Sequence, residues 1–284
     1  PFHLPLAVGL LGSEGQDLVF GLAGSEPAFI EQQSDLFTMV LSVTEAEQVF
    51  ELVNVSEPPV PSLLRGFSAP VKLEFAYSRD ELMFLMSHDN DGFNRWEASQ
   101  RLAVDVIIEG VEQIQDGKPL TVDSRLFKAM ELNLANALNR DQDASIDKAM
   151  IANMMVLPSE TYLAELFEVA DIDAIHQARE QVACEIAACL KGPLLSVFKM
   201  NDQQGECVAS AEAIASRSLR NAALAYLMKP TDTELVSLCA AQFNKASNMT
   251  DTGAAIRALV NSSNTAAQAV KHKALVEFYN RWAD

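Results

Sequence analysis

Residues 71–77 read VKLEFAY, and residues 91–106 read DGFNRWEASQRLAVDV. In the first stretch apolar and polar side chains alternate, which is typical of a half-buried β-strand. In the second, apolar residues from Phe93 to Val106 recur at helical spacing, behind Asn90 and Asp91, either of which can cap a helix. The hydrophobic period therefore changes from two to about 3.6 between Asp80 and Asp91. This change predicts a boundary between a β-rich part and an α-helical part.

The part before this boundary contains short apolar segments separated by turn-forming residues. Segments rich in Val, Phe and Leu occupy residues 4–11, 36–43, 48–55 and 71–77. Stretches such as GSEG at 12–15 and EPP at 57–59 separate them. Short strands at regular spacing, with breaks rich in Pro and Gly, predict a small antiparallel β-sandwich. We assign it to residues 1–88.

The part after the boundary, residues 89–284, has a helical period throughout. Its Gly and Pro residues stand mainly at the ends of periodic segments, which leaves room for at least eight helices. Short linkers predict that consecutive helices pack as antiparallel hairpins, and no fixed repeat period is visible. The fold class is therefore a β-sandwich followed by an irregular, superhelical all-α array. Because the chain has no initiator Met and its helical pattern is still running at Trp282, we expect it to be a piece of a longer protein, truncated at its C-terminus.

The charge balance limits the partners. The chain has 284 residues, with 21 Lys and Arg against 39 Asp and Glu, a formal net charge of −18. Such a surface repels nucleic acids and anionic membranes, and no apolar run is long enough to span a bilayer. We therefore expect a cytoplasmic protein with no nucleic-acid or membrane partner. Its four cysteines, Cys184, Cys189, Cys207 and Cys239, are expected to be reduced thiols buried in the core.

None of the usual metal motifs is present. The histidines His3, His88, His176 and His272 do not form H-E-x-x-H or its inverted form. His176 and Glu180 are predicted to be an exposed i,i+4 pair, because a third ligand is missing. Residues 88–92, HDNDG, do not have the register of a calcium loop and are predicted to form a turn and a helix N-cap. No residue is predicted to bind a metal.

Catalytic motifs are equally absent. Ser68, in GFSAP, lacks the second glycine and the following helix of a nucleophile elbow. Cys184 lies about 12 Å along a helix from His176, too far to share a proton, so both are interpreted as packing residues. No phosphate-binding glycine loop occurs. The sequence therefore predicts no catalytic and no cofactor-binding residue.

The most suggestive polar cluster is Arg217 and Arg220 on one helix, followed by Asn221. Two interpretations remain open. Buried arginines can tie helices together through carboxylates, or they can contact the carboxylate of a ligand.

Four motifs together resemble one enzyme family. They are FSAPVKL at 67–73, FNRWEA at 93–98, RSLRN at 217–221, and QF at 242–243 followed by NMTD at 248–251. In order and spacing they are similar to the third domain, a small Ig-like β-sandwich, and most of the helical fourth domain of bacterial aminopeptidase N. That family comprises zinc aminopeptidases of the M1 family, in the gluzincin clan. The resemblance covers the whole chain.

The resemblance implies that the full-length parent removes N-terminal residues from peptides with a zinc-activated water. In the family, the zinc ligands and the other catalytic residues lie in a preceding domain, so none is carried over to this sequence. Its implied role is a spacer and a helical lid that limits access to short peptides. The implied partners are peptide substrates and the parent's catalytic domain, and the acidic composition favours substrates with a positive N-terminus. The alternative is a stand-alone interaction module that binds a protein along a concave helical face.

Overall fold

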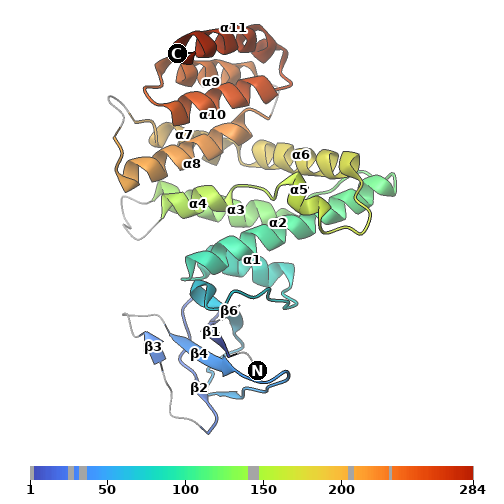
Figure 1. The fold of residues 1–284 in the computed structure, drawn as a ribbon, viewed down its shortest axis with the longest axis vertical. Helices are drawn as coiled ribbons and strands as arrows, with labels where there is room; N and C mark the ends of the chain where they lie inside the picture. The colour runs from blue at the N-terminus through green and yellow to red at the C-terminus, as the bar shows by residue number, and fades with distance from the viewer. Residues whose placement is uncertain are drawn as a thin grey trace. The chain divides into compact units, whose positions relative to one another are not determined.

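The computed structural model describes residues 3–24, 29–31, 37–139, 147–203, 208–229 and 232–283. It contains two compact units, Pro1–Leu102 and Ala103–Asp284, and helix α2 (Gly92–Gln115) continues from the first into the second. Figure 1 labels the elements in chain order. The division predicted after residue 88 stays a prediction.

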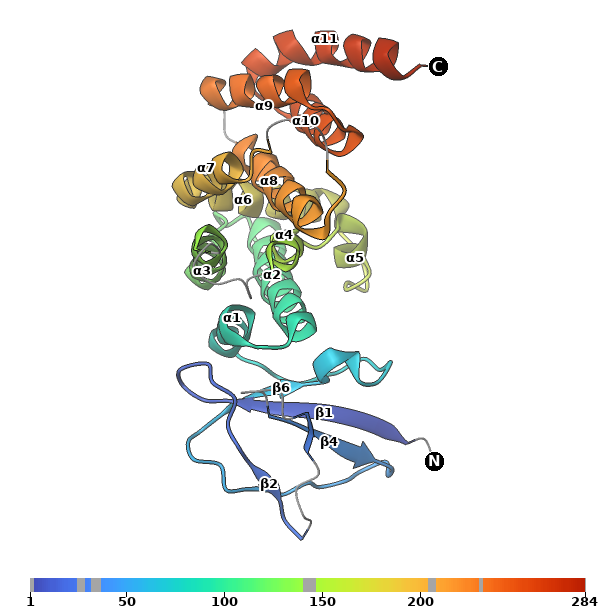
Figure 2. The ribbon, with the colours of Figure 1, turned by 90° about the vertical axis from the view of Figure 1, so that its left-hand side faces the viewer.

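The first unit is built on antiparallel strands. Four of them form a sheet in the order β3-β4-β1-β6, and two more form the separate pair β2-β5. Figure 2 shows β1 and β4 side by side. Val8 of β1 stands opposite Met39 and Leu63, so one face of the sheet is apolar. The strands are β1 (Leu4–Leu11), β2 (Gly21–Leu22), β3 (Phe29–Glu31), β4 (Thr38–Val43), β5 (Leu52–Val53) and β6 (Val60–Leu63).

The predicted strands are confirmed in part. The segment at 4–11 forms β1 as predicted, 36–43 contains β4, and 48–55 contains only the short β5. The prediction for 71–77 is wrong, because this segment has no ladder partner among the described residues. It is instead held by side chains: the Tyr77 hydroxyl donates to the Pro61 carbonyl at 2.7 Å, and the Arg101 guanidinium lies 5.1 Å from the centre of the Tyr77 ring. Alternation alone could not distinguish these cases.

Helices follow from residue 79 onward. Ser78 begins the first with a capping box, its hydroxyl accepting from the Glu81 amide. The described residues form eleven α-helices: α1 (Arg79–His88), α2 (Gly92–Gln115), α3 (Ser124–Leu138), α4 (Lys148–Met154), α5 (Glu160–Ala164), α6 (Ile172–Cys189), α7 (Lys191–Met200), α8 (Ala211–Leu227), α9 (Thr233–Lys245), α10 (Met249–Asn261) and α11 (Thr265–Trp282).

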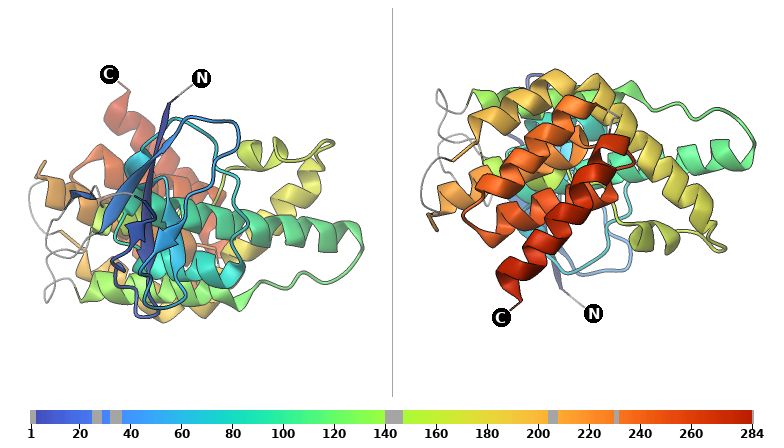
Figure 3. Two further views of the ribbon diagram at one scale, coloured as in Figure 1. Left: turned by 90° about the horizontal axis from the view of Figure 1, so that it is seen from below. Right: turned by 90° about the horizontal axis from the view of Figure 1, so that it is seen from above.

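The helices of the second unit pack in stacked pairs. Helix α3 packs against α7 while α4 packs against α8, and α8 in turn contacts α10. Neighbours in the chain also pack, as α7 with α8 and α9 with α10 do; Figure 3 shows α9, α10 and α11 side by side in its right-hand view. In such a stack each pair buries the apolar face of the previous one. The fold class is therefore the predicted one, a small antiparallel β part followed by a helical array.

The cysteines do not all lie in the core. Cys239 is buried, but Cys184 and Cys189 are exposed, so the prediction is wrong for these two. Cys184 falls outside the face of α6 on which Val182, Ala183 and Ile186 are buried, whereas Cys189 is the last residue of the helix. Cys207 lies outside the described residues.

Among the described residues no single helix has the length and hydropathy needed to cross a membrane, although the bent pair α6 and α7 together would have both.

Candidate functional site

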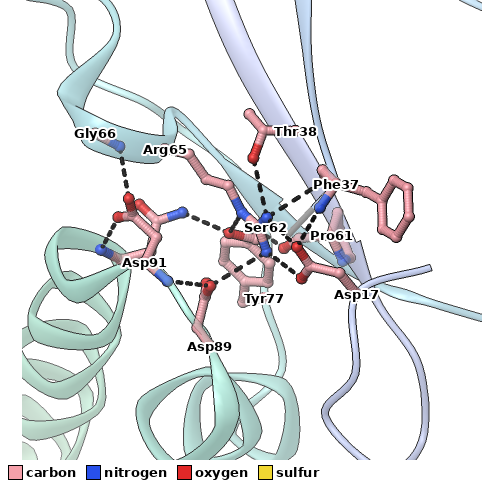
Figure 4. Close-up of polar contacts among 11 residues, drawn as sticks. Asp17, Phe37, Thr38, Pro61, Ser62, Arg65, Gly66, Tyr77, Asp89 and Asp91 are labelled. Carbon is pink, nitrogen blue, oxygen red and sulfur yellow. Dashed lines mark hydrogen bonds and ion pairs between the residues drawn. The ribbon is translucent and has the colours of Figure 1, made fainter. Parts of the chain in front are cut away.

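The first polar cluster is centred on Arg65, just after β6. Leu64 and Gly66 have positive φ angles of 59° and 61°, and this turn directs Arg65 back under the sheet. Both terminal nitrogens of Arg65 donate to Asp17 at 2.8 Å, and Nε donates to the Ser62 hydroxyl at 2.8 Å. Nη2 also reaches Asp89 at 3.3 Å (Figure 4). Every nitrogen of the guanidinium is thus bonded.

This Arg65 cluster is closed to solvent. The Arg65 side chain is 5% exposed and those of Asp17 and Asp89 are 0% exposed. A Cβ atom added at Gly9 of β1 would lie 2.0 Å from Arg65 Cζ, so the guanidinium needs a glycine at this position. One cation here faces two buried carboxylates. Burial raises the pKa of Asp89 above its ordinary value, against the lowering effect of Arg65.

Two of the family-like motifs meet at this cluster. From the FNRWEA motif, Asn94 donates to the Ser62 hydroxyl at 2.8 Å, and Phe93 packs against Phe67 with ring centroids 5.2 Å apart. From the FSAPVKL motif, the Ser68 hydroxyl accepts from the Ala7 amide at 3.0 Å. Both motifs therefore hold the first unit together, and Ser68 has a structural role.

In the HDNDG segment, Asp91 forms the predicted helix N-cap. Asp91 accepts from the backbone amide of Asn94 at 2.8 Å, which caps α2. Its other oxygen accepts from the Gly66 amide at 2.8 Å. The carboxylates of this segment are thus used for hydrogen bonds within the unit.

The other two motifs meet in the second unit. Asn221 donates to an Asp251 oxygen at 2.8 Å and accepts from the Gln242 amide at 2.8 Å. Asn248 caps α10 and donates its side-chain amide to the second Asp251 oxygen at 2.8 Å. RSLRN and QF–NMTD thus form one polar network that joins α8, α9 and α10.

The two arginines of RSLRN differ from each other. Arg220 forms an ion pair with Asp202 at 2.8 Å and stacks on Phe198 at 4.6 Å, as expected of an arginine that ties helices together. Arg217 donates instead to the Gln203 amide oxygen at 3.0 Å and the Val208 carbonyl at 2.9 Å. Arg220 thus binds a carboxylate of the protein, while the partners of Arg217 among the described residues are neutral.

A pocket of about 340 Å³ opens beside this network. We call it the Arg220 pocket. Its polar lining carries three cations and two carboxylates, whereas the whole chain has a net charge of −18. Arg220 Nε and Gln242 Oε1 are buried beside it with no hydrogen-bond partner among the described residues. The polar and charged residues of the lining are Lys199, Asp202, Gln203, Arg220, Gln242, Lys245, Ser247, Asn248 and Asp251.

A second hollow lies along α4, α8 and α10. It consists of two adjoining pockets of about 230 and 400 Å³, which share Val156, Ala222, Ala225 and Lys229. We call it the alanine groove, because Ala152, Ala183, Ala254 and Ala258 also line it, beside larger side chains such as Tyr226 and Met228. Small side chains leave room for an extended chain to approach the helix backbones.

The predicted pair of His176 and Glu180 is wrong. His176 Nδ1 lies 2.9 Å from Glu160, and Glu180 instead binds Lys229, its two oxygens lying 2.7 and 2.6 Å from Nζ. Partners outside α6, Glu160 for His176 and Lys229 for Glu180, replace the contact predicted from the i,i+4 spacing. Within the described part of the chain, no group of three or more His, Cys, Asp or Glu side chains is placed to hold a metal ion. These residues therefore do not fit a zinc ion, and no catalytic step is assigned to them.

Several residues of these sites were not predicted from the sequence. Asp17 is far in the sequence from Ser62 and Arg65, and Lys199 is far from Lys245. One available signal was that Arg65 is one of only 3 basic residues among the first 90.

The chain belongs to a family described as "domain of unknown function (DUF3458_C) ARM repeats", whose model matches residues 79–284. The companion model, DUF3458, described as having an Ig-like fold, matches residues 1–76. ARM repeats agree with the stacked helix pairs, although no repeat period was visible in the sequence.

Over almost its whole length the chain is homologous to bacterial aminopeptidase N. It is 38% identical to aminopeptidase N of Escherichia coli and 32% identical to that of Haemophilus influenzae, in both cases over 99% of this chain and 30% of the relative. The chain thus spans under a third of the length of these relatives. A crystal structure of Legionella pneumophila aminopeptidase A in complex with aspartic acid shares the fold, with a TM-score of 0.74 at 24% identity over 99% of this chain and 30% of that one.

Proposed function

We propose that this chain is the non-catalytic C-terminal part of a zinc-dependent aminopeptidase that removes N-terminal residues from peptides. The observation that carries the proposal is homology to aminopeptidase N over 99% of the chain but only 30% of the relative. The zinc would be bound by a part of the parent outside this chain, since the described residues offer no ligand set. This chain supplies no catalytic group.

Its role in the parent is that of a spacer followed by a helical lid, which covers the active-site cavity and admits short peptides. The alanine groove supports this role, because small side chains along α8 and α10 leave space for an extended substrate. A mostly apolar pocket with a few polar side chains is typical of a ligand site. The polar and charged residues that line the larger pocket of this groove are Asn153, Ser218, Asn221, Lys229, Arg257 and Asn261.

The proposed partners are peptide substrates and the catalytic domain of the parent, and the proposed compartment is the cytoplasm. The net charge of −18 supports the exclusion of nucleic acids and anionic membranes. The same charge favours peptides with a protonated N-terminus.

Metal analysis and an activity assay of residues 1–284 alone test whether zinc binding and catalysis belong to another part of the parent. We expect no stoichiometric zinc and no hydrolysis of an aminoacyl anilide. Turnover abolished by a chelator would show that this chain has a metal site of its own. It would contradict the assignment of chemistry to another part of the parent.

A substitution in the intact parent enzyme tests the lid. Ala225 is exposed and lines both pockets of the alanine groove, so Ala225→Trp would fill the groove. We expect kcat/KM for peptides of five or more residues to fall about tenfold, with that for an aminoacyl anilide little changed. The matched control is Ala188→Trp at an exposed position of α6 that lines none of the pockets described above. Equal losses for both substrates, or for both variants, would contradict a substrate-facing groove.

A further inference from the structure

The Arg220 pocket has no role in the proposed spacer and lid, and its chemistry differs from that of the alanine groove. The two hollows lie on different faces of α8, because Arg220 lines one while Ser218, Ala222 and Ala225 line the other. The Arg220 pocket is therefore a separate candidate ligand site.

The Arg220 guanidinium is fixed in place but only partly used. The Phe198 ring lies 4.6 Å from Arg220 Cζ, and the Asp202 ion pair uses Nη2, so the plane of the guanidinium is set from two sides. Apart from this ion pair, the guanidinium makes no hydrogen bond to a described residue, although the side chain is only 10% exposed. A planar guanidinium with free donors is suited to bind a carboxylate or phosphate group.

Two further cations stand at the same pocket. Lys199, near the end of α7, and Lys245, at the end of α9, both line it with exposed side chains. Neither forms an ion pair with a described residue. The two carboxylates of the lining, Asp202 and Asp251, offset two of its three positive charges. The pocket thus carries an excess of positive charge in a strongly acidic chain.

The floor of the pocket is rigid. Gln242 donates both to Asn221 at 2.8 Å and to the Asp251 carbonyl at 3.1 Å, which locks α9 to α8 and α10. A rigid floor lowers the entropy that is lost when a ligand binds. The volume of about 340 Å³ lies at the small end of ligand pockets and fits a metabolite better than a peptide.

We propose that the Arg220 pocket binds a small anionic ligand, with a carboxylate or phosphate group held by Arg220, Lys199 and Lys245. The proposed lid role does not use this pocket, so ligand binding here is independent of that role. Its test is direct binding to the chain, which does not require peptidase activity.

The experiment is a titration of residues 1–284 with succinate and, separately, with inorganic phosphate. Calorimetry measures the affinity, and NMR shifts of the backbone amides locate the site. We expect saturable binding of at least one of them with a Kd of about 1 mM or below, with shifts centred on α7–α10. Binding of succinate alone assigns a carboxylate ligand, and binding of phosphate alone assigns a phosphate ligand. No saturation of either up to about 10 mM would overturn the proposal.

The double variant Lys199→Gln/Lys245→Gln tests the site. Both lysines are exposed, so the fold is retained, and we expect the affinity to fall at least about tenfold. Lys271→Gln/Lys273→Gln on α11 removes the same charge elsewhere and should change the affinity less than about twofold. Arg220→Gln should abolish binding, but because Arg220 is buried its result counts only if the variant stays folded. Equal losses in the two lysine pairs would show non-specific attraction and overturn the proposal.

Discussion

The Arg65 cluster and the Arg220 network use the same chemistry to different ends. Each contains a buried arginine whose Nη atom lies 2.8 Å from an aspartate. Arg65 is bonded through all three nitrogens and lines none of the pockets described above, whereas Arg220 makes one ion pair to the described residues and lines a hollow. A closed cluster can only stabilise the fold, but an open one has donors left for a ligand. The number of satisfied hydrogen-bond donors therefore distinguishes a structural arginine from a candidate binding residue.

The largest expected effect comes from removing Arg65. Arg65→Met would leave Asp17 and Asp89 buried without their cation, which costs about 3 to 5 kcal/mol in comparable pairs. Urea unfolding measures the loss. Arg220→Met is the comparison, and we expect it to cost clearly less, because Asp202 is 41% exposed and can return to water. Equal losses would break the contrast between a closed and an open cluster.

A smaller effect is expected from Gly9→Ala. The new Cβ would lie 2.0 Å from Arg65 Cζ, so the guanidinium or the strand must move, at about 1 to 3 kcal/mol. The matched control is Gly192→Ala near the start of α7, where an added Cβ meets nothing within 4 Å. That control should be neutral or slightly stabilising. Thermal unfolding of both variants decides whether the Arg65 cluster is as tightly closed as its geometry indicates.

The excess negative charge of the Arg65 cluster predicts a pH dependence. Burial raises the folded-state pKa of Asp89 above the ordinary value of 3.8. A raised pKa means that the folded state binds the proton more tightly than the unfolded state, so this contribution is fully present at low pH. It is lost as pH rises from the unfolded pKa through the folded pKa. The stability of the wild type relative to Asp89→Asn should therefore decrease as pH rises above the ordinary carboxyl pKa of about 4. The opposite slope, in urea unfolding at several pH values, would mean that Arg65 outweighs burial.

How much of this could be predicted from the sequence depends on the range of the interactions. The change to a helical period and the Asp91 cap are local signals: helices follow from Arg79 onward, and Asp91 accepts from the Asn94 amide as a helix cap. The 71–77 segment failed because a strand requires a partner, and periodicity does not show whether one exists. His176 failed for the same reason, since Glu160 and Lys229 reach the pair from outside the helix that carries it.

The Arg65 cluster and the Arg220 pocket could not be predicted from the sequence, because they too depend on contacts between distant segments. Asp17, Arg65 and Asp89 are separated by tens of residues, and only the folded sheet and helices bring them together. The sequence singled out Arg220 but left its two interpretations open. What decides between them is the count of satisfied donors, which requires the positions of Asp202 and Phe198.

The smallest expected effect on the free energy of unfolding concerns α11, the last helix, whose large apolar side chains are partly exposed. Helix α11 carries an apolar stripe in which Tyr279 is 71% and Trp282 48% exposed, with Leu275 also exposed and Phe278 half-buried. Since Trp282 is only partly removed from water, Trp282→Ala should change the free energy of unfolding by less than about 1 kcal/mol. Phe243→Ala, at a residue only 2% exposed, should cost about 3 to 5 kcal/mol in the same urea experiment. If both aromatic residues cost several kcal/mol, Trp282 is packed in the folded chain in solution, and the stripe on α11 is not an open surface.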